Sequence, residues 1–252
     1  MGVFELPKVL NTDWDLVVSG DELDSIARVR SKELLEQSVS NKDLQDYLDK
    51  GWEIKKENKT KTTITKSKPI GDAFEDEVWS VMYKMGFKCL NKNNKFAIVY
   101  DERLGLSKQI DVFAMDDETC LFIECKAASK DGASTGWNKE IGEMASLFPK
   151  LKNAVKAQYP DKNLKFKYIF ATKNYTVGDQ DKNRLEDNNI TYFSDSTVLY
   201  YKRLADYLGT ASRYQLLGSL FAGTTIAGMD ATVPAIRGYM GKKVNYTFLI
   251  RP

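Results

Sequence analysis

Two short apolar runs of this chain carry ionisable side chains at positions where a buried strand normally has none. They span residues 109–115 and 119–128, and an acidic triplet separates them. Apolar runs of this length around polar turn residues predict a β-hairpin. Because side chains alternate between the two faces of a strand, Asp111 lies on one face of the first run, and Glu124 and Lys126 share one face of the second.

The expected turn sets the register of this hairpin. A turn centred between Asp117 and Glu118 pairs Met115 with Cys120. In that register Asp111 falls directly opposite Glu124, and opposed residues on one face have Cβ atoms roughly 4.5–5.5 Å apart. Two carboxylates at this spacing repel each other, and a divalent cation between them removes the repulsion. Lys126, on the same face as Glu124, then lies beside that cation.

The tripeptide Glu-x-Lys has little specificity on its own, because residues 53–55 and 57–59 match it as well. Those copies lie in a polar, lysine-rich segment, whereas Glu124 and Lys126 interrupt an otherwise apolar run. A buried carboxylate without a partner is costly, so such a group usually has a partner or a chemical role. The alternative is structural: an edge strand with one wet face, or a simple Glu124–Lys126 neighbour pair.

An amphipathic helix is predicted upstream, over residues 71–85. Its apolar stripe consists of Phe74, Val78, Val81, Met82 and Met85, and Gly86 is a typical C-terminal stop. Glu75 lies at the margin of the stripe and can face the sheet. Glu77 lies off the stripe, where we expect it to be solvated, and Asp76 is intermediate.

The chain resembles the PD-(D/E)xK nuclease superfamily in the order of its elements and in the residues that they carry. These are a helix with a glutamate, a strand, a second strand with an aspartate and a third strand with Glu-x-Lys. The Gly-x-x-Phe-Glu start of the helix is similar to that family's usual opening. The resemblance implies a restriction-endonuclease-like α/β fold and metal-dependent hydrolysis of DNA. It assigns catalysis to Glu75, Asp111, Glu124 and Lys126. It implies Mg²⁺, with Mn²⁺ as a substitute, held by Glu75, Asp111, Glu124 and the backbone carbonyl of Cys125.

The composition restricts the chemistry further. The chain has 252 residues, no histidine and a formal net charge of +2. Without histidine there is no Ser-His-Asp triad, Cys-His pair or His-ligated zinc site, so carboxylates and lysines remain for hydrolysis. The near-neutral charge requires any DNA-binding face to be a local patch. Three cysteines without metal-ligand spacing and no leader indicate a cytoplasmic protein without a membrane anchor.

Residues 1–70 are predicted to form an accessory region of helices over 21–37 and 41–50 and a hairpin of strands 52–54 and 62–65. Six lysines cluster on the hairpin with Trp52: Lys55, Lys56, Lys59, Lys61, Lys66 and Lys68. This cluster indicates either a surface that follows phosphates and carries an aromatic ring, or a solvated ribbon whose lysines protect its edge.

Residues 71–208 are predicted to form the nuclease domain, with alternating strands and helices that give a mixed sheet flanked by helices. After a polar connection, 88–94, the elements are strand 96–100, a charged bend, the central hairpin, helix 137–155, strand 166–172, helix 179–187, strand 190–193 and a helix from Asp195 or Ser196 to 208. Lys139, Glu140 and Glu143 either add to the site or form a solvated face.

Residues 209–252 are rich in small side chains and resemble the entry to DGQHR-domain proteins of bacterial DNA-modification and defence clusters. The Asp-Gly-Gln-His-Arg motif itself is absent. The resemblance implies the start of a further domain and a role in restriction or defence, with a homodimer and partner proteins left open. Arg213 and Arg237 either contact phosphate or belong to a packing tail. The alternative function is a catalytically silent, nuclease-like DNA-binding or interaction module of a larger complex.

Overall fold

A six-stranded mixed sheet forms the centre of the protein in the computed structural model, which describes residues 11–222, 225–226 and 229–230. The strands lie in the order β1 (Val17–Ser19), β5 (Cys89–Asn91), β8 (Val112–Met115), β9 (Thr119–Ala127), β10 (Lys165–Lys173) and β11 (Ile190–Phe193). From β1 to β9 neighbouring strands are antiparallel. The pairs β9–β10 and β10–β11 are parallel.

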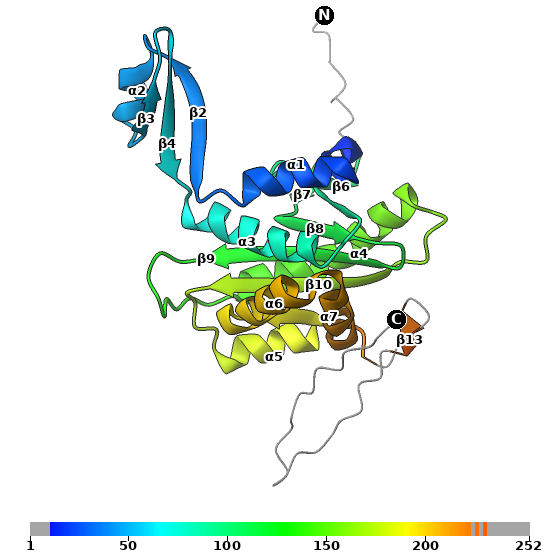
Figure 1. Ribbon diagram of the computed structural model, residues 1–252. Coiled ribbons are helices and arrows are strands. Elements are labelled where there is room, and N and C mark those ends of the chain that lie inside the picture. Colours follow the sequence, from blue (N-terminus) through cyan, green and yellow to red (C-terminus); the bar gives the residue numbers. More distant parts are fainter. Residues whose placement is uncertain (1–10, 223–224, 227–228, 231–252) are drawn as a thin grey trace, which may run out of the picture.

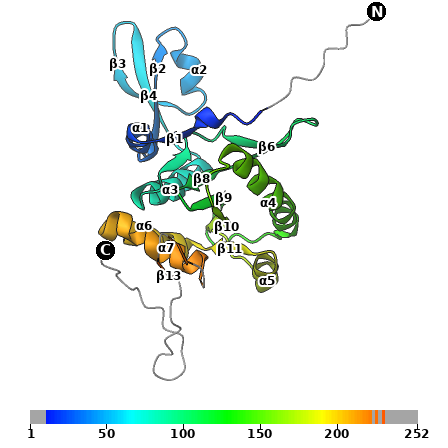
Figure 2. The same cartoon turned by 90° about the vertical axis from the view of Figure 1, so that its right-hand side faces the viewer.

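Helices cover both faces of this sheet (Figure 2). On one face lie α1 (Asp21–Arg30), α3 (Ile70–Lys84), α6 (Asp195–Leu208) and α7 (Ser212–Leu220), and on the other lie α4 (Asn138–Gln158) and α5 (Asp179–Asp187). Each layer has its own core, because alternate side chains of β8 to β11 point to opposite faces. Ile123 lies in the core under α3, and Phe122 lies in the core under α4. The predicted mixed α/β sheet between helices is therefore confirmed.

The β8–β9 hairpin has the predicted register, with Met115 opposite Cys120. Its two-residue turn is closed by the amide of Asp116, which donates to the carbonyl of Thr119 at 3.0 Å. The Asp116 carboxylate also accepts the amides of Glu118 and Thr119. The ladder ends at Val112 and Ile123, so the next facing positions are those of Asp111 and Glu124.

A separate three-stranded sheet projects from the body above the start of α3, and we call residues 31–68 the arm (Figure 1). It contains β2 (Leu34–Ser40), α2 (Leu44–Leu48), β3 (Glu53–Glu57) and β4 (Lys61–Ser67). The predicted hairpin is confirmed as β3 and β4. The predicted helix over 21–37 is wrong beyond Arg30, because Leu34–Ser40 pairs with all of β4, and this pairing outweighs the helical propensity of its leucines and glutamate.

A second correction concerns residues 88–101. The predicted polar connection contains β5, a strand of the central sheet, and the predicted strand 96–100 is β6 (Ala97–Asp101), which pairs only with β7 (Leu106–Gln109). The side chain of Asn91 explains why β5 is polar. Its amide donates to the carbonyl of Asp111 at 3.1 Å and its oxygen accepts from Phe113 at 3.0 Å, so it bonds to the backbone as a neighbouring strand does.

The predicted strand 109–115 is shorter than expected, because Gln109 ends β7 and β8 begins at Val112, which places Asp111 just before the strand. The other predicted elements are confirmed, with α5 and β11 matching to the residue. The cap of α6 is Ser194, whose hydroxyl accepts the amide of Thr197 at 3.3 Å, rather than Asp195 or Ser196. At the two ends, η1 (Trp14–Leu16) precedes β1, and η2 (Gly209–Ala211) joins α6 to α7. Leu216 and Leu220 of α7 lie in the same core as Phe74. The first part of segment 209–252 thus packs on the body, and Arg237 lies outside the described residues.

Two short strands, β12 (Thr225–Ile226) and β13 (Met229–Asp230), pair with each other. Among all the helices described, none is long and apolar enough to cross a lipid bilayer.

Candidate active site

Asp111 and Glu124 meet where the β8–β9 ladder ends. Both are buried, with 8% and 7% of their surface exposed. The main-chain amide of Cys125 donates to Oδ2 of Asp111 at 2.8 Å, which fixes this carboxylate against β9. Burial and the negative charge of Glu124 raise the pKa of Asp111 to about 6. The predicted pair of mutually repelling carboxylates is therefore present.

Two lysines hold the second carboxylate of this pair. Nζ of Lys126 lies 2.6 Å from Oε1 of Glu124, and Nζ of Lys108 lies 3.3 Å from Oε2. Lys108 lies on β7 and also contacts Glu143 of α4 at 3.1 Å. Burial alone would lower the pKa of Lys126, but the adjacent Glu124 outweighs it and the pKa is raised. Both lysines are therefore held as cations beside Glu124.

Glu75 lies on the second turn of α3 and approaches Asp111 from the face of the sheet that α3 covers. It is half-buried, and burial followed by the charge of Asp111 raises its pKa to about 7. Within the described chain its carboxylate makes no hydrogen bond or ion pair. The charge of Asp111 thus acts on Glu75, and the Arg30 guanidinium offsets only part of the rise in its pKa.

The predicted metal ligands fit a magnesium site of low protein coordination. Across the described residues, no three acidic, cysteine or histidine side chains lie close enough to form a metal cage. Magnesium, however, is commonly bound by one or two carboxylates and keeps several waters. The hard oxygens of Asp111, Glu124 and the Cys125 carbonyl match that donor chemistry, with Oδ1 of Asp111 unbonded in the described structure. Glu75 interacts electrostatically with Asp111.

Three side chains near the site are absent from the sequence-based assignment. Lys108 contacts Glu124, Asn91 holds the backbone at Asp111, and Tyr168 packs on Phe122 of the same face as Glu124. The hydroxyl of Tyr168 is buried and has no hydrogen-bond partner in the described part of the chain. Lys108 could have been found from the sequence, because it is a lysine only three residues before Asp111. Asn91 and Tyr168 have no local sequence signal, since their roles come from neighbouring strands.

Three of the six lysines of the predicted basic cluster on the arm are engaged in internal contacts. Lys68 is buried and contacts Asp76 at 2.6 Å. Lys55 contacts Glu36 at 2.6 Å, and Lys66 donates to the carbonyl of Lys50. Trp52 packs edge-on against Tyr47 and is only partly exposed. Lys56, Lys59 and Lys61 remain exposed. The arm thus offers a smaller basic surface than its sequence indicates.

The two acidic residues after Glu75 form ion pairs. Asp76 bridges Arg30 and Lys68, each at 2.6 Å. Glu77 bridges Lys173 at 2.6 Å and Lys202 at 2.7 Å. The expectation that Glu77 is solvated is wrong, because β10 and α6 bring these lysines to it. Glu143 is likewise bonded to Lys108, whereas Lys139 is exposed.

No protein-family model and no curated protein matches this chain. Among solved structures it is similar to protein VC1899 from Vibrio cholerae, with 14% identity and a TM-score of 0.38. The match covers 75% of this chain and 51% of that protein, so the chain spans about half of its length.

Proposed function

We propose that this protein is a metal-dependent DNA endonuclease with a restriction-endonuclease-like fold, acting in a bacterial restriction or defence system in the cytoplasm. The observation that supports this most strongly is the junction of Asp111, Glu124 and Lys126 at the end of one hairpin, with Glu75 adjacent. Burial and a neighbouring carboxylate raise the pKa of both Glu75 and Asp111, and such perturbed carboxyl groups are typical of cation-binding and catalytic sites.

In this proposal Asp111, Glu124 and the carbonyl of Cys125 hold Mg²⁺, and Glu75 assists through a water. When bound, Mg²⁺ supplies an activated water and stabilises negative charge on the phosphate. The bond from Cys125 to Asp111 keeps one carboxylate oriented before substrate arrives. Lys126 is 35% exposed at its side chain and can turn from Glu124 to a phosphate oxygen, where its charge offsets the charge that develops during hydrolysis.

The test is cleavage of supercoiled plasmid and single-stranded DNA by the wild type and by Lys126→Ala, with Mg²⁺, with Mn²⁺ and with chelator. We expect metal-dependent nicking or linearisation by the wild type only. Lys182→Ala is the matched control, because Lys182 is an ion-paired surface lysine of α5. Cleavage retained by Lys126→Ala, or cleavage insensitive to chelator, would contradict the proposal.

One observation favours the second candidate, a nuclease-like module that binds DNA without cleaving it. Both oxygens of Glu124 already contact lysines, Lys126 and Lys108. If these contacts persist with Mg²⁺ and DNA present, Glu124 cannot serve as a metal ligand. Calorimetric titration of Mg²⁺ into the wild type and Glu124→Gln separates the two candidates. Equal Mg²⁺ binding by both proteins, together with DNA binding but no cleavage, supports the silent module.

A further inference from the structure

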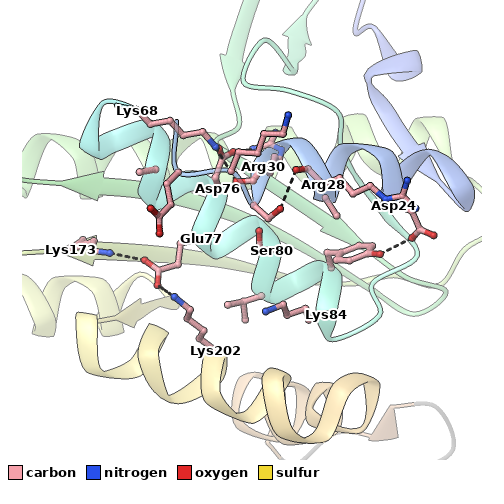
Figure 3. A pocket seen from close by; sticks show the side chains of 17 residues that line it. Asp24, Arg28, Arg30, Lys68, Asp76, Glu77, Ser80, Lys84, Lys173 and Lys202 are labelled. Atoms are coloured by element: carbon pink, nitrogen blue, oxygen red, sulfur yellow. Dashed lines mark hydrogen bonds and ion pairs between the residues drawn. The ribbon is translucent and has the colours of Figure 1, made fainter. Parts of the chain in front are cut away.

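A second charged site lies on the outer face of α3, away from the candidate active site. It is a cleft of about 730 Å³ between α1, α3 and α6. Figure 3 shows Arg28 and Arg30 on its α1 side, Lys202 on its α6 side, and Asp76 and Glu77 between them. This volume is within the usual range of ligand pockets, roughly 300–1,000 Å³.

The lining of this cleft is strongly cationic. Seven arginine and lysine side chains line it against four carboxylates, an excess of three, whereas the whole chain carries a net charge of only +2. The positive charge of the protein is therefore concentrated here. A hollow surface of one sign focuses the electrostatic potential and attracts ligands of the opposite sign.

The ion pairs on α3 leave two of these three positive charges uncompensated, because Asp206 of α6 neutralises Lys84. Asp76 accepts Arg30 on one oxygen and Lys68 on the other, and Glu77 does the same with Lys202 and Lys173. Each carboxylate thus holds two cations and leaves about one positive charge over. Because the carboxylates fix these side chains in place, an incoming anion meets cations that are already positioned.

Two more cations at the α1 end have no ion-pair partner in the described structure. Arg28 and Lys32 are both exposed and both line the cleft. Because neither side chain is held in an ion pair by the described residues, both are available to an incoming anion. Their position beside two bridged cation pairs extends the positive surface along one wall of the cleft.

We propose that this cleft binds a phosphate-bearing anion through the accessible side chains of Arg28, Lys32, Lys173 and Lys202. Arginine and lysine are the usual protein partners of phosphate. Two sources supply such a group: a nucleic-acid strand leading away from Glu75, which is adjacent to Asp76 on α3, or a free polyphosphate or nucleotide. Binding of a nucleic-acid strand rests on the proposed nuclease function, whereas binding of a free anion does not.

The experiment measures binding of a fluorescent single-stranded oligonucleotide and of inorganic tripolyphosphate in chelator, where no metal-dependent cleavage occurs. The variant is Arg28→Glu with Lys202→Glu, one residue from each wall. Its control is Lys156→Glu with Lys182→Glu on the opposite face, which changes the net charge equally. A second variant, Arg28→Glu with Lys32→Glu, breaks no ion pair and so avoids a folding defect. Thermal unfolding checks every variant.

We expect each cleft variant to bind at least tenfold more weakly than the wild type and the control. For a single-stranded oligonucleotide, loss of two phosphate contacts should also flatten the salt dependence by about 1.4 units of slope. Loss of oligonucleotide binding alone assigns the strand, loss of tripolyphosphate binding alone assigns the free anion, and loss of both indicates a shared phosphate site. Equal binding by folded cleft variants and control, or no binding by the wild type, overturns the proposal. Cleavage assays are run separately, so an inactive enzyme does not obscure this result.

Discussion

The main-chain amide of Cys125 donates to Oδ2 of Asp111 at 2.8 Å, so this carboxylate also closes the hairpin where the strand ladder ends. Asp111 therefore has a structural role and a proposed chemical role in one side chain. Asn and Ala substitutions separate the two, because asparagine keeps an oxygen acceptor and alanine does not.

For Asp111→Asn we expect loss of cleavage with stability equal to or above that of the wild type at pH 8, since the repulsion from Glu124 is removed. Asp111→Ala leaves the buried amide of Cys125 without a partner and should be about 1–3 kcal/mol less stable than the asparagine variant. Urea unfolding followed by circular dichroism measures both. Coincident unfolding curves for the two variants would show that the bond carries no stability.

Glu75 should make the metal-free protein less stable as the pH rises. Its pKa is about 7 in the folded protein against an ordinary value of 4.5. Between these values the folded chain binds more protons than the unfolded chain, so the free energy of unfolding falls with increasing pH. Glu75→Gln removes this dependence and should gain stability over the wild type from pH 5 to pH 8.

The measurement is urea unfolding in chelator at pH 5, 6, 7 and 8. Glu102→Gln, at an exposed position of the β6–β7 hairpin, is the control and should track the wild type at every pH. A constant difference between Glu75→Gln and the wild type across this range would show that Glu75 does not titrate there.

Lys126 should affect hydrolysis and not binding. We expect Lys126→Ala to cut DNA at least about a hundredfold more slowly, the usual cost of losing one catalytic group. Affinity for DNA, measured in chelator by fluorescence anisotropy, should stay within about threefold, since one phosphate contact among many is lost. Lys126→Arg keeps the charge but not the compact ammonium, and should recover only part of the rate. Equal losses of rate and affinity would instead make Lys126 a binding residue.

Asp76 should be a strong stability determinant. It compensates Arg30 and Lys68, whose side chains are 8% and 7% exposed. Asp76→Asn leaves two buried cations without their carboxylate and should cost about 3–5 kcal/mol. Asp179→Asn is the matched control: that carboxylate pairs with Lys182 while 94% exposed, and its loss should cost about 0–1 kcal/mol. Similar unfolding midpoints for the two variants would contradict the buried-bridge interpretation.

Gly86 should tolerate no side chain. Its φ is +79°, and an added Cβ would lie 2.7 Å from Cγ2 of Thr210. Gly86→Ala should cost about 1–3 kcal/mol. Gly71→Ala, in α3 with open space around the new methyl group, should be neutral or stabilise by roughly 0.5–1 kcal/mol. Adding Thr210→Ser to Gly86→Ala should restore part of the loss in thermal unfolding, and no restoration would assign the whole cost to backbone strain.

The hairpin and the helices were predictable because local patterns specify them. The turn at Asp116 and the alternation of Phe113, Met115 and Phe122 toward one core set the register that brings Asp111 to Glu124. Gly86 follows the end of α3 with a positive φ, the backbone conformation that favours glycine after a helix. The positions of the proposed catalytic residues thus follow from short-range sequence patterns.

The missed features depend on contacts between distant segments. Residues 34–37 read as helix, but β4 pairs with them. Leu90 and Asn91 read as a polar connection, yet the side chain of Asn91 bonds to the backbone around Asp111. Glu77 reads as solvated because its partners, Lys173 and Lys202, are 96 and 125 residues away in sequence. A local hydrophobic pattern in the sequence cannot specify contacts between segments so far apart.

The bridge at Asp76 also makes the arm a separable insertion. Arg30 precedes the arm and Lys68 ends it, yet both contact the same carboxylate, and Lys68 donates to the carbonyl of Arg30 at 2.9 Å. Neither core of the body includes a residue between these two positions. The ends of the arm are therefore joined at one point, as in a domain inserted into a loop, and a short linker can span them. The arm can accordingly be exchanged or lengthened without changing the sheet that carries Asp111 and Glu124.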